Sequence, residues 1–359
     1  MKCKGYFGIL AALFLLTACS GSGEDGDMRQ RGVDGKTVQL RLSFPVGDLG
    51  SRGPGDPGVT EILSAPTYAW IFFVDQSGNV PPVGSVQYKD GENWYNLPRR
   101  VTMTGFFGDT VKESYAGSLS VTDDVVWRFP MKMLQFVGVT SGKFYIVASN
   151  VPLKSGGTPL EDVSVSTEED ILDLDFDLYN ADMREDIGNI YSTPYNYNIG
   201  SPSSYYGSWK GGADDIIDLL LYHVAARVDV KWNVDETLQP TRKVKTLQVG
   251  GLKSKGCKIF RPMDNNTLGA DPYTITLKTS SEIGRQWYGR QAFYAIPYTD
   301  SPTTYFPIDF TVDNGTEENT TSIKLNMMGA NTVFVPWIRL NMTYDEDADF
   351  TQSELLLNE

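Results

Sequence analysis

The most constraining feature of this 359-residue chain is a strictly alternating stretch at residues 224–232. The side chains on one side of an extended backbone are all apolar: Val224, Ala226, Val228, Val230 and Trp232. The residues between them are mostly charged. A period of two predicts a long β-strand with one buried face. A chain built around such strands must supply further strands and a second sheet to cover that face.

Further strand patterns recur along the whole chain. Before residue 224 we expect strands at Thr37–Phe44, Tyr68–Val74, Val125–Phe129, Lys132–Val139 and Lys143–Ser149. After residue 240 we expect them at Val244–Val249, Tyr273–Leu277, Ala292–Ile296, Tyr305–Val312, Thr321–Asn326 and Val333–Tyr344. The only helix candidates are Val59–Leu63 and Ala213–Leu219. Many short strands separated by turn signals predict an all-β protein with two β-sandwich domains in series.

We place the domain junction close to Pro240. The length suits two domains of ordinary size, predicted at residues 37–238 and 239–359. Residues 19–36 are polar, charged and rich in glycine, so they are predicted to form a flexible tether ahead of the first strand.

The N-terminus predicts export. Lys2 and Lys4 precede a short apolar core at Gly8–Leu16, which is too short for a permanent membrane span, so residues 1–18 are expected to form a signal peptide. The stretch Leu16–Cys19 is similar to the bacterial lipobox, in which the cysteine is acylated and becomes the mature N-terminus. We therefore predict lipidation of Cys19. The alternative is an ordinary secretory signal with an incidental cysteine.

Charge and cysteine usage exclude several classes of protein. The chain has 31 Lys and Arg against 45 Asp and Glu, a net charge of −14, which argues against nucleic acid as a partner. With Cys3 removed and Cys19 lipidated, Cys257 is the single thiol left, so no internal disulfide is expected. Cys257 is predicted to be a small buried residue at a strand start.

No residue constellation indicates catalysis. The single histidine, His223, is expected to be structural or to face solvent. Asp173, Asp175 and Asp177 alternate with apolar residues, which predicts a solvated strand face. A calcium loop is the alternative, although Leu178 and Arg184 stand where an EF-hand needs Gly and Glu. We expect no enzymatic activity, no cofactor and no metal.

An aromatic stretch offers a second candidate site. Residues 188–212 are rich in Tyr, Asn, Ser, Pro and Gly and lack periodicity. Such a mixture suits contact with a glycan or a protein partner, and the candidate residues are Tyr195, Tyr197, Tyr205, Tyr206 and Trp209. The alternative is an ordinary loop packed over the first sandwich.

Several motifs resemble the fimbrillin family, the lipoprotein subunits of type V pili. Thr37–Phe44 is similar to the family's first strand, and Gly55–Glu61 resembles its entry to the apolar strand at Tyr68–Val74. Phe144–Asn150 and Leu221–Val230 look like two further family strands. The resemblance covers most of the mature chain. It implies two transthyretin-like sandwiches, other pilus subunits as partners and a lipid-anchored place on the outer cell surface.

The resemblance also implies assembly by strand exchange. In polymerising family members an arginine-directed protease cuts after the first strand, which leaves, and the C-terminal segment of another subunit fills the gap. Arg52 follows the predicted first strand in a Gly/Pro-rich stretch, so it is the candidate processing site, with an ordinary loop residue as the alternative. A cut at Arg29 or Arg31 would release only the tether. The acidic tail Asp345–Glu359 alternates poorly, which leaves a shaft, anchor or accessory subunit open.

A rival function comes from a different class. The aromatic stretch would also suit a surface glycan-binding lipoprotein of a polysaccharide-uptake system. Sugar affinity without self-assembly would favour this rival, whereas protease-triggered polymerisation would favour the pilus component.

Overall fold

The computed structural model describes residues 35–45, 65–114, 125–177, 190–193, 208–209, 215–224, 226–234, 236, 244–253, 257–260, 272–278, 288–295, 304–312, 317–325, 337–344 and 350–358. Strands dominate this part of the chain, which is all-β as predicted. Its helices are short: α1 (Met103–Phe107), η1 (Leu160–Asp162, a 3-10 turn) and α2 (Glu168–Leu172). Thr167 caps α2 through a reciprocal capping box with Asp170.

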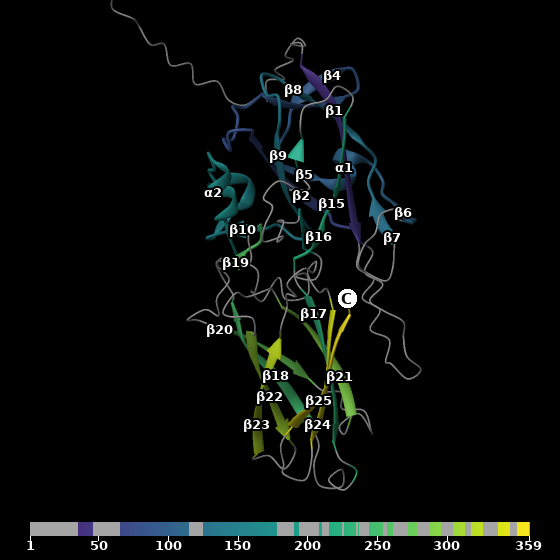
Figure 1. The fold of residues 1–359 in the computed structure, drawn as a ribbon, viewed down its shortest axis with the longest axis vertical. Helices are drawn as coiled ribbons and strands as arrows, with labels where there is room; N and C mark the ends of the chain where they lie inside the picture. Colours follow the sequence, from purple (N-terminus) through teal and green to yellow (C-terminus); the bar gives the residue numbers. More distant parts are fainter. Residues whose placement is uncertain are drawn as a thin grey trace, which may run out of the picture.

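Two large sheets form the upper part of the molecule in Figure 1. The seven-stranded sheet has the order β4-β3-β8-β1-β7-β6, with β15 beside β1. Its strands are β1 (Lys36–Pro45), β3 (Val86–Asp90), β4 (Asn93–Asn96), β6 (Val111–Ser114), β7 (Val125–Arg128), β8 (Lys132–Phe136) and β15 (Asp215–Leu220). The six-stranded sheet has the order β16-β13-β9-β2-β5, with β14 beside β9. Its strands are β2 (Tyr68–Asp75), β5 (Arg100–Thr102), β9 (Gly142–Ser149), β13 (Tyr191–Ser192), β14 (Ser208–Trp209) and β16 (Tyr222–His223).

Three smaller sheets complete the described structure. One has the order β11-β10-β12-β19 and lies beside the two large sheets. Its strands are β10 (Lys154–Ser155), β11 (Thr158–Pro159), β12 (Asp175–Phe176) and β19 (Cys257–Lys258). We call this small sheet and the two large sheets together the N-terminal sheets.

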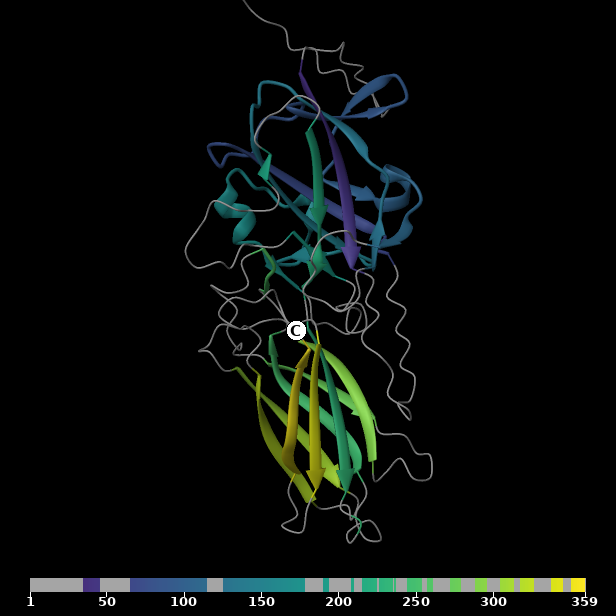
Figure 2. The same ribbon diagram turned by 45° about the vertical axis from the view of Figure 1, so that its right-hand side comes forward.

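The other two sheets, the C-terminal sheets, form the lower part of the molecule (Figures 1 and 2). Their orders are β21-β17-β24-β25 and β20-β18-β22-β23. The strands are β17 (Ala226–Val234), β18 (Val244–Lys253), β20 (Pro272–Lys278), β21 (Tyr288–Ala295), β22 (Thr304–Val312), β23 (Glu317–Leu325), β24 (Trp337–Tyr344) and β25 (Phe350–Asn358).

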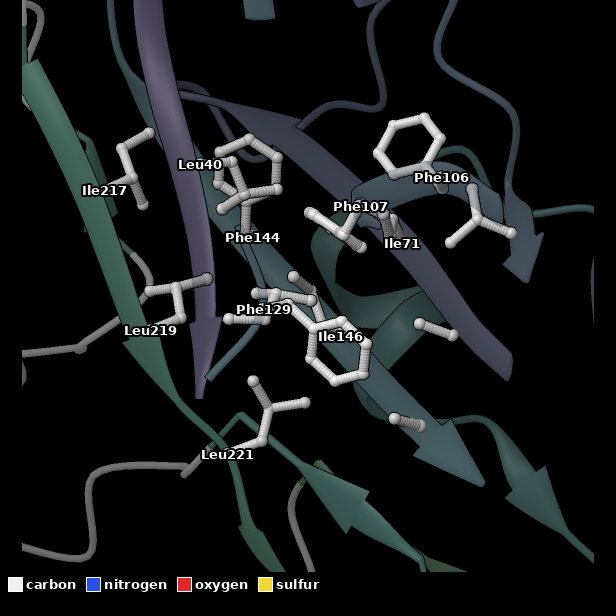
Figure 3. Packing of buried hydrophobic residues seen from close by; sticks show 14 of the residues in the cluster. Leu40, Ile71, Phe106, Phe107, Phe129, Phe144, Ile146, Ile217, Leu219 and Leu221 are labelled. Atoms are coloured by element: carbon white, nitrogen blue, oxygen red, sulfur yellow. The ribbon is translucent and has the colours of Figure 1, made fainter. Parts of the chain in front are cut away.

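The core of the N-terminal sheets lies between the two large sheets. It joins the inward side chains of β1, β8 and β15 to those of β2 and β9. Figure 3 shows Leu40, Ile217 and Leu219 on one side and Ile71, Phe144 and Ile146 on the other. This is the packing of a β-sandwich, in which alternate residues of each sheet fill the space between the two faces.

Strand β2 is buried on both faces. Ile71 and Phe73 point into the sandwich core, while Trp70 and Phe72 are buried on the opposite side. On this second face the Phe260 ring packs edge-on against Phe72, and Trp70 Nε1 donates a hydrogen bond to Glu161 Oε2. The double burial explains why the sequence of β2 is continuously apolar rather than alternating.

Most of the expected strands are confirmed, with ends that shift by a few residues. A tight turn follows β2: Asp75 Oδ1 accepts hydrogen bonds from the backbone N–H groups of Ser77 and Asn79, and Gly78 has a φ of 77°. The helix expected at Ala213–Leu219 is wrong, because residues 215–220 form strand β15. Buried Ile217 and Leu219 there alternate with exposed Ile216 and Asp218, which is a period of two.

Strand pairing does not follow the boundary predicted between residues 238 and 239. Strand β17 precedes that boundary, yet it pairs with β21 and β24 in the C-terminal sheets. Strand β19 follows it, yet it pairs with β12 in the N-terminal sheets. The helix candidate Val59–Leu63 lies outside the described residues.

The alternation of β1 predicts a sharp contrast between neighbouring substitutions. Leu40→Ala should lower the free energy of unfolding by about 2–5 kcal/mol, because Leu40 is fully buried and its truncation leaves a cavity. Gln39→Ala on the opposite face should change it by only about 0.5 kcal/mol. Urea unfolding followed by tryptophan fluorescence measures both. Equal effects of the two substitutions would contradict the described register.

Candidate functional site

Strand β1 lies in the interior of its sheet rather than at an edge. On one side β8 pairs with Lys36–Leu40 and β7 pairs with Ser43–Pro45, both antiparallel. On the other side β15 pairs with residues 38–43 in parallel. The backbone of β1 is therefore bonded along both sides, and its removal would expose two facing strand edges.

The side chains of β1 fill the sandwich core. Val38, Leu40, Leu42 and Phe44 are each at most 1% exposed. The Phe44 ring packs edge-on against Tyr191 and Phe129, with ring centroids 5.2 and 5.8 Å away. Burial of this kind contributes about 1.5–3 kcal/mol per large side chain. A segment replacing β1 would therefore need apolar side chains at the same alternate positions.

Polar contacts fix β1 to its neighbours on the outer face. Arg41 forms an ion pair with Asp218 of β15, its partner in the register. Arg128 of β7 donates a hydrogen bond to Ser43 Oγ at 3.3 Å and pairs with Glu113 of β6 at 2.9 Å. The two ion pairs are partly exposed and contribute to register more than to stability.

The C-terminal tail forms a strand of its own chain. Residues 350–358 make up β25, which pairs antiparallel with β24 at the end of the strand order β21-β17-β24-β25. The pairing shifts register near Asn341, which matches the poor alternation of the tail sequence. The tail is thus able to adopt the extended conformation that a donor strand needs.

The structure places few of the predicted site residues. Cys19, Arg29, Arg31 and Arg52 lie outside the described residues. So do four of the five aromatic candidates: Tyr195, Tyr197, Tyr205 and Tyr206. The fifth, Trp209, belongs to β14, whose backbone pairs with β9 at Gly142. Lipidation, processing and partner contact at these residues stay predictions.

Burial alternates at the three aspartates, but only Asp175 lies in a strand: Asp173 is the C-cap of α2, and β12 is limited to Asp175–Phe176. Asp173 and Asp175 are exposed, whereas Leu174 and Phe176 between and after them are buried. Lys258 Nζ lies 2.8 Å from Asp175 Oδ1 and 3.8 Å from Asp173 Oδ1, and Asp177 Oδ2 accepts a hydrogen bond from the Gly157 N–H. The carboxylates thus contact a lysine and a backbone amide. Over the ranges described, no three or more His, Cys, Asp or Glu side chains gather as a metal site.

Cys257 and His223 both lie in short strands. Cys257 starts β19 and is buried, which confirms its prediction. The backbone of His223 in β16 pairs with Tyr191 of β13. In the part of the chain that the structure describes, no helix is long and apolar enough to span a membrane.

A polar cluster, which no pattern in the sequence predicted, links Glu161 to Trp70 of β2 and Arg100 of β5. Trp70 Nε1 donates to Glu161 Oε2 at 2.9 Å, and Arg100 Nη1 donates to Glu161 Oε1 at 2.6 Å. Burial opposes ionisation of Glu161. The hydrogen bonds from Trp70, its own backbone and Arg100, with the Arg100 charge, outweigh burial and lower the pKa of this carboxyl. Sequence analysis also missed β15 as the partner of β1, although Ile217 and Leu219 carry its period of two.

No family model matches the chain, and no curated protein matches it either. Solved structures do show similarity. A candidate cell adhesion protein from Bacteroides ovatus is 11% identical, with 90% of this chain and 98% of that chain covered and a TM-score of 0.41. The fimbrial anchor protein Mfa2 from Porphyromonas gingivalis is 9% identical, with 90% and 97% covered and a TM-score of 0.41.

A third similar structure carries a different name. It is a candidate polysaccharide-binding protein from Bacteroides thetaiotaomicron, 8% identical, with 90% of this chain and 96% of that chain covered and a TM-score of 0.44.

The Glu161 cluster predicts a pH dependence of stability. Because the pKa of Glu161 is lowered in the folded state, its contribution is present above the ordinary value of 4.5 and is lost as the pH falls through the folded value. Glu161→Gln should therefore be less stable than wild type at pH 7, and the difference should shrink below pH 4.5. Thermal unfolding at several pH values from about 3 to about 7 measures this difference in stability. Glu92→Gln, on an exposed turn, is the control. A difference that stays constant with pH would contradict it.

Proposed function

We propose that this chain is a lipid-anchored component of a surface pilus that acts in cell adhesion and assembles by exchange of strand β1. The proposal rests above all on the position of β1. This strand directly follows the predicted tether and is the first described strand of the chain, yet it is bonded on both sides and fills the core. Its departure would leave a gap that another extended apolar segment fits.

The gap would be specific for a strand. Main-chain groups of β8, β7 and β15 would provide affinity along both edges, while the vacated positions of Val38, Leu40, Leu42 and Phe44 would fix the register. A donor segment would lie antiparallel to β8, as β1 does. We propose a role in binding and assembly without catalysis, and Cys19 as the residue that carries the lipid.

A cut after Arg52 would separate β1 from the rest of the chain. Arg52 lies seven residues beyond Pro45, the last residue of β1, and thus on the far side of that strand from the tether. Cleavage there would leave β1 held by noncovalent contacts alone. The tether cut at Arg29 or Arg31 would leave β1 covalently attached, so the two positions give distinguishable outcomes.

Processing is tested with an arginine-specific protease on the lipid-free protein that begins at Ser20. We expect cleavage after Arg52, a matching loss of mass and growth of oligomers on size exclusion, because the freed gap takes up a strand of another copy. Arg52→Lys keeps the positive charge but resists the protease, so it should stay monomeric. The matched control is the double variant Arg29→Lys, Arg31→Lys, which should still assemble.

If the protease cuts only after Arg29 and Arg31 and the protein stays monomeric, strand exchange triggered by cleavage after Arg52 is contradicted. It would leave an anchor or accessory subunit, or the glycan-binding rival, as the better account.

Register specificity is tested with synthetic peptides of residues 34–46 added to the cleaved protein. The natural peptide should compete with the donor segment and slow oligomer growth, because it restores the buried side chains of β1. A peptide with Leu40→Asp and Leu42→Asp should have no effect, since a buried charge at either position is costly. A peptide with Gln39→Asp on the outer face should act like the natural one. Equal inhibition by all three peptides would contradict the proposed register.

A further inference from the structure

Strand β19 leaves the sheets of its sequence neighbours. The strands before and after it, β18 and β20, pair with one another in the C-terminal sheets. Strand β19 instead pairs with β12 in the N-terminal sheets, where Asp175 faces Lys258 and Phe176 faces Cys257. The chain therefore passes from the C-terminal sheets to the N-terminal sheets and back again within residues 253–272. We call residues 257–260 the strap.

The strap is firmly anchored in the N-terminal sheets. Cys257, Ile259 and Phe260 are 1%, 3% and 1% exposed. The Phe260 ring packs edge-on against three aromatic rings of these sheets: Phe72 at 6.1 Å, Tyr145 at 5.5 Å and Phe176 at 6.0 Å between centroids. Aromatic pairs in this arrangement are favourable beyond the area that they bury.

Polar contacts of Lys258 also attach the strap to the N-terminal sheets. Lys258 Nζ lies 2.8 Å from Asp175 Oδ1 and also donates to the backbone carbonyl of Asp173. Its side chain is only 13% exposed, so the contact is partly shielded from water. The strap therefore combines backbone pairing, an ion pair and a buried aromatic anchor within four residues.

Two short links connect the N-terminal sheets to the C-terminal sheets. Strand β16 ends at His223 and β17 begins at Ala226, a span of at most about 11 Å. Strand β18 ends at Lys253 and the strap begins at Cys257, a span of at most about 14 Å. Strands β17 and β18 belong to different C-terminal sheets, so each of these sheets has its own short link.

We propose that the strap is an orientation lock, which holds the C-terminal sheets in one orientation on the N-terminal sheets. A single link at residues 224–225 would let the C-terminal sheets swivel about it. A second short link, starting from the other C-terminal sheet and ending in a buried anchor, blocks that rotation. The lock lets a load applied to one group of sheets reach the other without a change in their angle. The proposed lock does not depend on lipidation, on processing at Arg52 or on strand exchange.

The lock is tested by distance measurements between spin labels on the full lipid-free protein. One label replaces Val83, which is 90% exposed in the turn before β3, and the other replaces Glu236, which is exposed just after β17. Wild-type protein should give a narrow distance distribution. A flexible Gly/Ser insertion of about six residues between Ser254 and Lys255 lengthens the link but leaves the strap intact, and should broaden the distribution about twofold or more.

The matched control carries the same insertion after Gly91. This glycine lies in the β3–β4 turn with a φ of 57°, and no atom lies within 4 Å of the position a Cβ would take. The control should keep the narrow wild-type distribution. A broad distribution in wild type, or an unchanged one after the insertion at the strap, would overturn the lock.

A second pair of variants separates the anchor from general stability. Phe260→Ala removes the aromatic anchor of the strap and should broaden the distribution. Phe129→Ala removes an equally buried ring that packs on Phe44 and Phe107 in the sandwich core, away from the strap, and should leave it narrow. Equal broadening by both variants would overturn the assignment to the strap. Circular dichroism verifies folding, and if Phe260→Ala does not fold, the insertion pair decides the outcome.

Discussion

The constraint on which the N-terminal sheets depend is the position of β1, whose backbone pairs along both edges and whose side chains are buried between the two large sheets. Val38, Leu40, Leu42 and Phe44 occupy the centre of the sandwich, and β7, β8 and β15 align to the backbone that carries them. Removing such a strand costs much stability, and only a segment with apolar side chains at the same alternate positions can replace it. The same contacts stabilise one copy and, in the proposed exchange, would make the replacement of β1 by a strand of another copy selective.

The sequence predicted those strands whose apolar positions are set by which of their faces are buried. The alternation of β1 follows from one buried face, and the unbroken apolar run of β2 follows from two. The alternation at Asp173–Asp177 and the burial of Cys257 were predictable for the same reason. In contrast, β15 was mistaken for a helix because Ile216 and Leu220 add apolar residues off its alternate positions, although Ile217 and Leu219 keep the period of two.

What the sequence could not predict is long-range pairing. Strand β19 is two residues long, and nothing local in Cys257–Lys258 shows that its partner is Asp175–Phe176 rather than a strand near it in sequence. The residues that pair in parallel between β1 and β15 lie 177 positions apart in the sequence. The pairings near Pro240 illustrate this: β17 lies before residue 239 but pairs with β21, and β19 lies after it but pairs with β12.

The most direct test of the account is a cryo-EM structure of the assembly formed after cleavage at Arg52. It would show which chain supplies the strand between β8 and β15. The account predicts a segment from a second copy, antiparallel to β8, with apolar side chains at the positions of Val38, Leu40, Leu42 and Phe44. Finding each copy's own residues 36–45 still in that position would contradict strand exchange and leave β1 a purely structural strand.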